Sequence, residues 1–376
     1  MAVTKEQVLA ALQDVKSPEG IPLPKSGTLS EIVAADGKVF FSITVDAAAV
    51  KAWEAVRKRA EEVVRALPGV QSAMIALTAE RKAGAPGGRG AEPPSVRSPR
   101  TAARGEALQG IPGVEAIIAV ASGKGGVGKS TTAVNLALGL AALGLKVGIL
   151  DADIYGPSLP KLLAIRERPQ TVGGTRLKPI TRYGLTVMSI GFLIDEETPM
   201  IWRGPMVISA LTQMLREVEW GTLDILVVDM PPGTGDAQLT MAQQVPLKGA
   251  VIVSTPQDLA LIDARRGISM FNRVNVPVLG IVENMSYFLC PQCGTRSDIF
   301  GHGGARDEAQ RQGVRFLGEV PLHMSIREKS DAGLPVVATE PDTPYAAAYR
   351  NIATAVRDQL KANTTGRAAP KIVIEA

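Results

Sequence analysis

The sequence has 376 residues but only two cysteines and two histidines. So few cysteines in a long chain exclude the disulfide framework that small secreted proteins use in place of a large core. Aromatic residues make up 4% of the chain. No apolar run approaches the roughly 18 to 20 residues that a membrane helix needs, and the first twenty residues lack the apolar core of a signal peptide. We therefore expect a soluble, cytoplasmic protein with no membrane partner.

Neither sign of charge dominates the composition. The chain has 41 lysines and arginines against 37 aspartates and glutamates, which gives a net charge of +4. A surplus this small gives no ground to expect a nucleic-acid partner. Hydrophobic residues make up 45% of the chain, which is enough for a large core and for two domains.

Residues 1–80 have the pattern of a small α/β domain. Thr4 and Gln7 have the spacing of a capping box ahead of a short helix. Two strand-like runs flank Asp36-Gly37, a pair typical of hairpin turns. A long helical pattern follows, and Val70–Thr78 has the composition of a last strand. Because no paired catalytic groups occur here, we expect a docking or scaffold domain.

Residues 81–110 are rich in glycine, proline, serine and arginine, with scarcely any apolar side chain. This composition cannot form a core, so we expect a flexible linker. Residues 111–362 then alternate apolar strand patterns with helical patterns, and residues 363–376 form a C-terminal tail. Continuous apolar strands between helices predict an α/β fold, a doubly wound and mainly parallel sheet of the P-loop NTPase type. After the first strand, we expect strands over Lys146–Ile154, Thr186–Phe192, Asp224–Met230, Ala250–Thr255, Val278–Val282 and Phe316–Val320.

A glycine-rich motif joins a strand pattern to a helical pattern in the stretch AIIAVASGKGGVGKSTT. Gly123, Gly128, Lys129 and Ser130 fit the phosphate-loop pattern G-x-x-x-x-G-K-[ST]. Glycines allow backbone amides to turn toward an anion. We expect Lys129 to reach the β- and γ-phosphates and the Ser130 hydroxyl to bind Mg²⁺. The expected nucleotide-binding residues of the motif are Gly123, Lys124, Gly125, Gly126, Val127, Gly128, Lys129, Ser130 and Thr131.

Lys124 is a second lysine within this loop, and an ordinary phosphate loop does not need it to hold a nucleotide. Its position resembles that of the signature lysine of the deviant Walker A ATPases, which include septum-site, partitioning and nitrogenase iron proteins. The resemblance implies that Lys124 acts in catalysis with Lys129. It would do so by crossing a nucleotide-sandwich dimer to contact the phosphates held by the partner subunit.

Aspartates follow two of the apolar strand patterns. Asp229 comes after the run ILVV, and a carboxylate that ends a buried strand near a phosphate loop can hold Mg²⁺ opposite Ser130. We expect Asp153 to position the attacking water and Asp151 to support the Mg²⁺ site, although these two roles are interchangeable. The run PPGTG after Asp229 is expected to turn a backbone amide toward the γ-phosphate, as switch segments do.

Cys290 and Cys293 form a C-x-x-C motif and are the only cysteines of the chain. Closed zinc and [4Fe-4S] sites use four ligands, so one chain cannot supply four thiolates but two chains can. A cluster held between two subunits is therefore one interpretation, with Cys290 and Cys293 as its ligands. Three alternatives stay open: a thioredoxin-like redox pair, a zinc site completed by His302 or His323, and thiols that bind nothing.

Several motifs in order resemble the Mrp/ApbC-type iron-sulfur cluster carrier ATPases of the deviant Walker A class: SGKGGVGKSTT, LDADIYGPS, DMPPGTGD, STPQDLAL, GIVENMSYFLCPQCG and IFGHGGA. The resemblance spans about Gly113 to Arg357. It implies ATP binding and hydrolysis, a homodimer, and a [4Fe-4S] cluster that is bridged between subunits and delivered to apoproteins. It also implies that Asn284 contacts the purine base. The N-terminal domain resembles the small domain often found in iron-sulfur assembly proteins.

Two other classes of function remain open. A positioning ATPase that cycles on a membrane or on DNA needs an amphipathic anchor or a basic face. Tyr345–Lys361 is only mildly amphipathic and of mixed charge, and so lacks the basic stripe expected of such an anchor. The other class is a zinc-bound scaffold or regulator that uses ATP as a conformational switch.

Overall fold

The structure is a computed structural model that describes residues 3–30, 32–35, 38–46, 49–70, 72–80, 110–172, 176–193 and 204–365. The expected linker, except for its last residue, lies outside the described residues. So do the Asp36-Gly37 turn and residues 366–376 of the expected tail. The chain divides into two units, Met1–Ala107 with Ile201–Ala210, and Leu108–Met200 with Leu211–Ala376.

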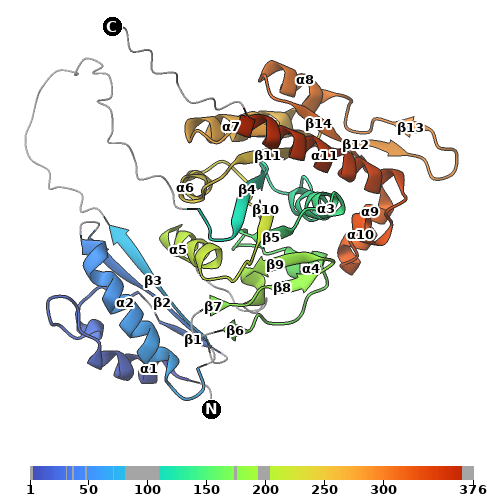
Figure 1. Cartoon of the computed structure of the whole chain (residues 1–376). Coiled ribbons are helices and arrows are strands. Elements are labelled where there is room, and N and C mark those ends of the chain that lie inside the picture. Colours follow the sequence, from blue (N-terminus) through green and yellow to red (C-terminus); the bar gives the residue numbers. More distant parts are fainter. Residues whose placement is uncertain are drawn as a thin grey trace, which may run out of the picture. The chain divides into compact units, whose positions relative to one another are not determined.

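The second unit is built on a sheet whose strands follow the order β13-β12-β11-β4-β10-β5-β9-β8, with β14 also paired to β12 (Figure 1). The strands from β14 and β12 through to β9 pair in parallel, and β8 and β13 add antiparallel edges. The predicted mainly parallel α/β sheet is thus confirmed. The strands are β4 (Val114–Ala121), β5 (Val147–Asp151), β8 (Ile180–Arg182), β9 (Leu185–Ser189), β10 (Leu223–Asp229), β11 (Gly249–Ser254), β12 (Val278–Leu289), β13 (Arg296–Ser297) and β14 (Phe316–Leu322).

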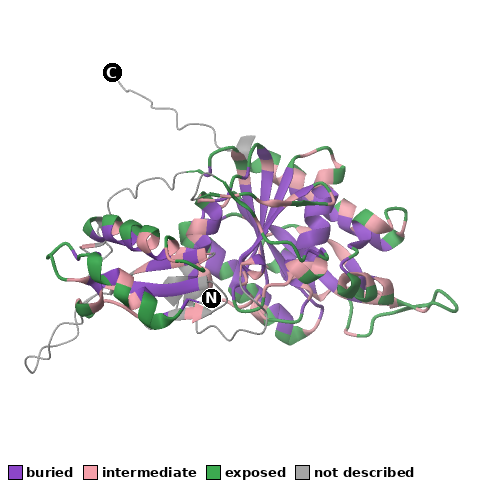
Figure 2. Ribbon diagram, turned by 90° about the horizontal axis from the view of Figure 1, so that it is seen from below, coloured by how far each residue is buried: buried purple, intermediate pink, exposed green. Residues whose placement is uncertain are grey.

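Helices flank this sheet, and its central strands are buried along most of their length (Figure 2). The helices are α3 (Lys129–Ala142), α4 (Leu159–Leu162), α6 (Asp236–Gln244), α7 (Asp258–Arg273), α8 (Gly304–Arg311), α9 (Met324–Ala332), α10 (Val336–Thr339) and α11 (Pro344–Thr365). Helix α5 (Gly204–Arg216) is divided between the units, because residues 204–210 group with the first unit. The short strands β6 (Thr171–Val172) and β7 (Arg176–Leu177) pair antiparallel, apart from this sheet. No helix of the described ranges has both the length and the apolar character needed to cross a bilayer.

One strand is longer than the sequence predicts. We expected a strand over Val278–Val282, but β12 continues to Leu289. The polar residues Glu283 and Asn284 end the apolar pattern, yet both are buried and hydrogen-bonded, so the strand does not end there. This extension carries the chain from the sheet to the C-x-x-C motif.

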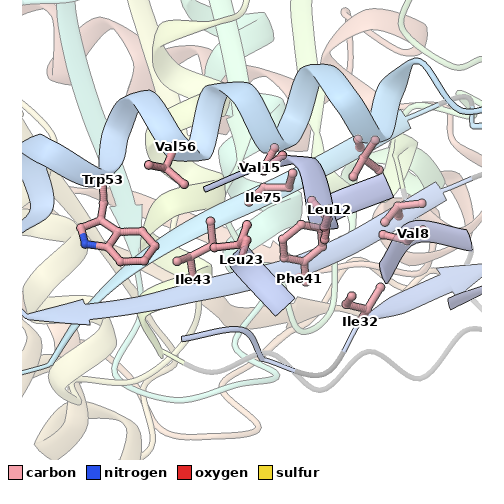
Figure 3. Packing of buried hydrophobic residues seen from close by; sticks show 14 of the residues in the cluster. Val8, Leu12, Val15, Leu23, Ile32, Phe41, Ile43, Trp53, Val56 and Ile75 are labelled. Atoms are coloured by element: carbon pink, nitrogen blue, oxygen red, sulfur yellow. The ribbon is translucent and has the colours of Figure 1, made fainter. Parts of the chain in front are cut away.

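The first unit is a three-stranded sheet, β1-β2-β3, with a helix packed on it. β1 pairs antiparallel with β2, and β2 pairs in parallel with β3. Apolar side chains from the helices and the sheet meet in one core, in which Phe41, Ile43 and Ile75 are fully buried (Figure 3). The predicted capping box of Thr4 and Gln7 is confirmed. The elements are α1 (Lys5–Ala11), 3₁₀ turns at Leu12–Asp14 and Leu23–Lys25, β1 (Val33–Ala35), β2 (Lys38–Asp46), α2 (Val50–Arg65) and β3 (Ser72–Glu80).

Candidate nucleotide site and cysteine hairpin

The phosphate-loop motif connects β4 to the first turn of α3, at the carboxyl end of the central strands. Gly126 and Gly128 have φ of +81° and +80°, which side chains with a Cβ rarely adopt. Gly123 is constrained by space, because an added Cβ would lie 2.2 Å from the backbone of Asp263 in α7. The loop therefore needs glycine at these three positions. The backbone amides of the loop lie at the N-terminus of helix α3, and a helix N-terminus favours the binding of anions.

Lys129 is buried at the start of α3 and faces Asp229 at the end of β10. Its Nζ donates hydrogen bonds to Asp229 Oδ1 at 2.5 Å and to Ser130 Oγ at 3.1 Å. The structure thus brings together the three residues to which the sequence assigns phosphate and Mg²⁺ contacts. The ammonium balances the charge of a carboxylate that is fully buried.

The donors around Asp229 fit a magnesium ion. Asp229 Oδ2 is buried without a hydrogen-bond partner among the described residues, and such an atom is costly unless a cation or a donor reaches it. The Ser130 hydroxyl belongs to the same group of side chains through its contact with Lys129. Mg²⁺ prefers carboxylate and hydroxyl oxygens together with phosphate oxygens and water. Asp229 and Ser130 therefore match the donor set that Mg²⁺ with a nucleotide requires.

Asp151 is bound on several sides. Its carboxylate accepts hydrogen bonds from the backbone amides of Asp153, Ser158 and Leu159 and from the Ser189 hydroxyl, at 2.9 to 3.2 Å. Burial raises the pKa of Asp151 to about 7, and the nearby charge of Asp229 adds to this rise. Through these hydrogen bonds, Asp151 connects the loop after β5 to strand β9. The support of Mg²⁺ by Asp151 stays a prediction.

Asp153 is less buried than Asp151 and lies in the loop after β5. Burial raises the pKa of its carboxyl group, and the nearby Lys129 charge opposes the rise. Asp153 is thus a partly exposed carboxylate that is electrostatically coupled to the phosphate-loop lysine. This is compatible with contact to water beside a nucleotide, and its role in catalysis stays a prediction.

The PPGTG segment after β10 contacts the phosphate loop through its backbone. The Gly233 amide donates to the Ser122 carbonyl at 2.9 Å, and Gly233 has φ of +105°. Gln238 donates from its side chain to the Pro232 carbonyl at 2.7 Å. The segment is therefore joined to the loop in this structure, and the amide of Gly233 points at the loop carbonyl.

Three other predicted residues lie around the same loop. Asn284 donates from Nδ2 to the Val127 carbonyl at 2.8 Å, so it contacts the loop from β12. Lys124 is partly exposed, and its carbonyl accepts from the Ser122 hydroxyl at 2.8 Å. The Thr131 carbonyl accepts from the Asn135 side chain, within α3. Contact of Asn284 with a purine and of Lys124 with a partner's nucleotide stay predictions.

The two cysteines lie on a hairpin that extends from the edge of the sheet (Figure 1). Cys290 directly follows β12, and its amide donates to the Thr295 carbonyl at 3.0 Å. The Gly294 amide closes the turn by donating to the Cys290 carbonyl at 2.8 Å. Cys293 is exposed and Cys290 is partly exposed. Both thiols are therefore accessible to a second molecule.

Among the described residues, neither histidine is grouped with these cysteines in an arrangement that could hold a metal ion. Nδ1 of His302 lies 2.9 Å from Arg296 Nη2, and His323 accepts from the Ser325 amide at the start of α9. Within the described ranges, no group of three or more His, Cys, Asp and Glu side chains is placed to hold a metal ion. In the part of the chain that the structure describes, the hairpin offers a metal two thiols.

Cys293 has a neighbour that favours its ionised form. The Thr295 hydroxyl lies 3.1 Å from Cys293 Sγ, and its hydrogen bond lowers the pKa of the Cys293 thiol below the ordinary value. The Thr295 backbone and Cys290 act in the same direction. The thiolate is the form of cysteine that binds metals, so the lowered pKa of Cys293 favours the binding of a metal ion by the hairpin.

Several polar residues that the sequence analysis did not single out connect the hairpin to the sheet. Glu283, Ser286, Glu319 and Arg296 are linked by hydrogen bonds of 2.6 to 3.2 Å, and the first two are buried. The sign of these contacts in the sequence is Glu283, a glutamate that interrupts an apolar strand pattern. Its partners on other elements could not be read from the sequence.

Comparison with known proteins identifies the family. Residues 113–357 match the family described as NUBPL iron-transfer P-loop NTPases, and residues 5–75 match an iron-sulfur cluster assembly protein family. The iron-sulfur cluster transfer protein NUBPL of Mus musculus is 53% identical over 279 residues, which cover 73% of this chain and 88% of that protein. The iron-sulfur cluster carrier protein of Escherichia coli K12 is 58% identical over 252 residues, 67% of this chain and 68% of that protein.

A solved structure agrees with these relatives. The nucleotide-binding protein of Archaeoglobus fulgidus, in complex with ADP, has a TM-score of 0.55 and 41% identity, and the match covers 62% of this chain and 90% of that one. The resemblance seen in the ordered motifs is thereby confirmed. The chain belongs to the iron-transfer P-loop NTPase family, whose curated relatives are named as carriers of iron-sulfur clusters.

Proposed function

We propose that this protein carries a [4Fe-4S] cluster between two copies of the chain, hydrolyses ATP at the phosphate loop, and transfers the cluster to apoproteins. The observation that carries the proposal is the hairpin with two accessible cysteines and no third metal ligand among the described residues. A [4Fe-4S] cluster takes four thiolates, so a symmetric pair of hairpins supplies the set. The names of the curated relatives support the same cargo.

The nucleotide chemistry follows from the residues around Lys129. The loop amides and the Lys129 ammonium would hold the phosphates, and Asp229 and Ser130, which both contact Lys129, would hold Mg²⁺. Bound Mg²⁺ supplies positive charge that stabilises the transferring phosphoryl group. Asp153 orients the attacking water, and Lys124 contacts the nucleotide of the partner subunit. The ADP complex of the Archaeoglobus fulgidus protein supports nucleotide binding at this fold.

The exposure of the hairpin suits a carrier. A cluster held by Cys290 and Cys293 at the edge of the molecule is open to the thiolates of a recipient, which can replace those of the carrier one at a time. The recipients are apoproteins with cysteine ligands of their own. A location in the cytoplasm, and the absence of membrane and nucleic-acid partners, stay predictions from the composition.

Anaerobic reconstitution with iron and sulfide tests this function. We expect a broad visible absorption band that is lost in the Cys290→Ala/Cys293→Ala variant, and transfer of the cluster to an apo-ferredoxin that depends on Mg-ATP. Stoichiometric zinc without such a band would favour the zinc-bound scaffold. Co-sedimentation with liposomes or DNA in the presence of ATP would favour a positioning ATPase.

A further inference from the structure

Strand β12 contacts both functional parts of this unit. Near its middle, Asn284 donates to the Val127 carbonyl of the phosphate loop. The fit is close, because a Cβ added to Gly128 would lie 2.1 Å from the Asn284 amide nitrogen. Cys290 follows the last residue of the same strand. Five residues, 285–289, therefore lie between the residue that contacts the loop and the first cysteine.

Between these two points the strand is irregular. Asn284 pairs with Val320 of β14, and Phe288 pairs with Leu322, so four steps along β12 match two steps along β14. Met285, at the start of this bulge, has φ of +56°, a conformation that is strained for a side chain of its kind. Such bulges redirect a strand and are often found near functional sites. The bulge is the point at which the strand turns from the sheet toward the hairpin.

The bulge is held by one buried hydroxyl between two carboxylates. Ser286 Oγ lies 2.6 Å from Glu283 Oε1 and 3.0 Å from Glu319 Oε2. A hydroxyl has one proton, so Ser286 can donate to only one of the two carboxylates at a time. Glu283 also accepts from the Ala305 amide at 2.7 Å. Two alternative hydrogen-bond arrangements are thus available at this serine.

Glu319 connects the serine to the hairpin through Arg296. The guanidinium donates to Glu319 Oε2 at 3.2 Å and to Asp298 Oδ1 at 3.0 Å, and it stacks over the Tyr287 ring at 4.1 Å. Arg296 pairs with Leu289 across the hairpin, directly before the first cysteine. A guanidinium that donates to several acceptors and also stacks on an aromatic ring has a more fixed position than one that forms a single ion pair. Arg296 therefore holds the base of the cysteine turn.

We propose that the β12 bulge, bound to the phosphate loop by Asn284 and to the cysteine turn by Ser286, Glu319 and Arg296, transmits nucleotide binding to Cys290 and Cys293. This proposal rests on the function proposed above and adds the route between its two sites. Ser286 and Arg296 are positioning residues that act through the backbone of the hairpin. When a bound nucleotide fixes the carbonyls of the phosphate loop, the side chain of Asn284 has fewer accessible positions. One of the two hydrogen-bond arrangements at Ser286 is then favoured, and the cysteine turn becomes more ordered.

Amide hydrogen exchange in the hairpin tests this route without a cluster. The readout is exchange at the Cys290 and Gly294 amides, whose hydrogen bonds close the turn. In the wild-type protein, saturating Mg-ADP is expected to slow this exchange several-fold. Arg296→Ala is expected to speed exchange about tenfold without nucleotide, because charge-assisted contacts that hold the turn are lost. Ser286→Ala leaves the Arg296 contacts in place, so only the response to Mg-ADP is expected to disappear.

The control variant is Arg327→Ala, because Arg327 forms exposed ion pairs on α9 with Glu328 and Asp331 and should leave exchange in the hairpin unchanged. Calorimetry is used to check that each variant binds Mg-ADP as the wild type does. A wild-type hairpin that does not respond to bound Mg-ADP overturns the proposal, as does a full response in both Ser286→Ala and Arg296→Ala. Failure of the protein to hold iron overturns the carrier function separately, because this experiment contains no iron.

Discussion

The Lys129 ammonium lies 2.5 Å from Oδ1 of Asp229, and the second oxygen of that carboxylate has no hydrogen-bond partner in the part of the chain that the structure describes. One side chain is the expected phosphate ligand and the other the expected magnesium ligand. A magnesium ion at Asp229 would repel the ammonium and attract phosphate. With Mg-nucleotide bound, Asp229 would therefore hold Mg²⁺ and Lys129 would hold phosphate in place of their mutual ion pair.

Lys129→Ala is expected to abolish nucleotide binding and also to destabilise the fold. The variant leaves the buried Asp229 carboxylate without its counter-charge, which costs about 3 to 5 kcal/mol in comparable cases. The double variant Lys129→Ala/Asp229→Asn is expected to recover much of that stability in urea unfolding but to remain unable to bind ATP by calorimetry. Wild-type ATP affinity in Lys129→Ala would contradict the assignment of the loop.

Asp229→Asn is expected to remove most of the dependence of ATP affinity on Mg²⁺, because an amide oxygen is a weaker ligand than a carboxylate. The measurement is ATP affinity with Mg²⁺ and with a chelator. Asp224→Asn, at the other end of β10, is the matched control. Asp224 lies away from the phosphate loop and accepts a hydrogen bond from the Lys146 amide. If Asp229→Asn kept the full enhancement by Mg²⁺, the magnesium site would have to lie elsewhere.

Lys124→Ala is expected to bind ATP normally and to hydrolyse it more slowly, because the side chain is partly exposed beside the loop and its proposed contact is with a partner subunit. Single-turnover hydrolysis at several protein concentrations measures the effect. Lys146→Ala, an exposed lysine before β5, is the control. Equal rates in Lys124→Ala and in the wild type would argue against a role for this residue across a dimer.

Thr295→Val is expected to raise the pKa of the Cys293 thiol, because the hydroxyl that stabilises the thiolate is removed. The rate at which iodoacetamide alkylates Cys293 is measured over a range of pH. In the variant this rate should begin to increase at a higher pH than in the wild type. Thr295→Ser keeps the hydroxyl and should retain the wild-type profile. An unchanged profile in Thr295→Val would mean that the backbone of the turn, and not this hydroxyl, sets the reactivity.

The parallel sheet and the phosphate loop could be predicted because their determinants are local. Apolar runs mark the buried strands, and Gly128, which the motif requires, has a positive φ that suits a glycine. The order of the strands and the burial of Lys129 against Asp229, 100 residues apart, depend on how the strands pair. The motif implied the proximity of those two side chains, but not their direct ion pair.

The extension of β12 could not be predicted, because its stability depends on distant partners. Glu283 ends the apolar pattern, yet its buried carboxylate accepts from Ser286 and from the Ala305 amide, which lies 22 residues further along the chain. Arg296 had no visible role in the sequence, since its acceptor Glu319 belongs to β14. Polar contacts between elements are invisible to patterns of hydrophobicity, and in this protein they join the two candidate sites.

The most direct test of the carrier function measures iron, sulfide and zinc in anaerobically purified protein together with its mass in solution. We expect a dimer with about four iron and four sulfide ions per pair of chains, as one [4Fe-4S] cluster requires. We also expect the Cys290→Ala/Cys293→Ala variant to contain no iron. A protein that remains a monomer with ATP and iron present, or that never holds iron on its two cysteines, would contradict the carrier function.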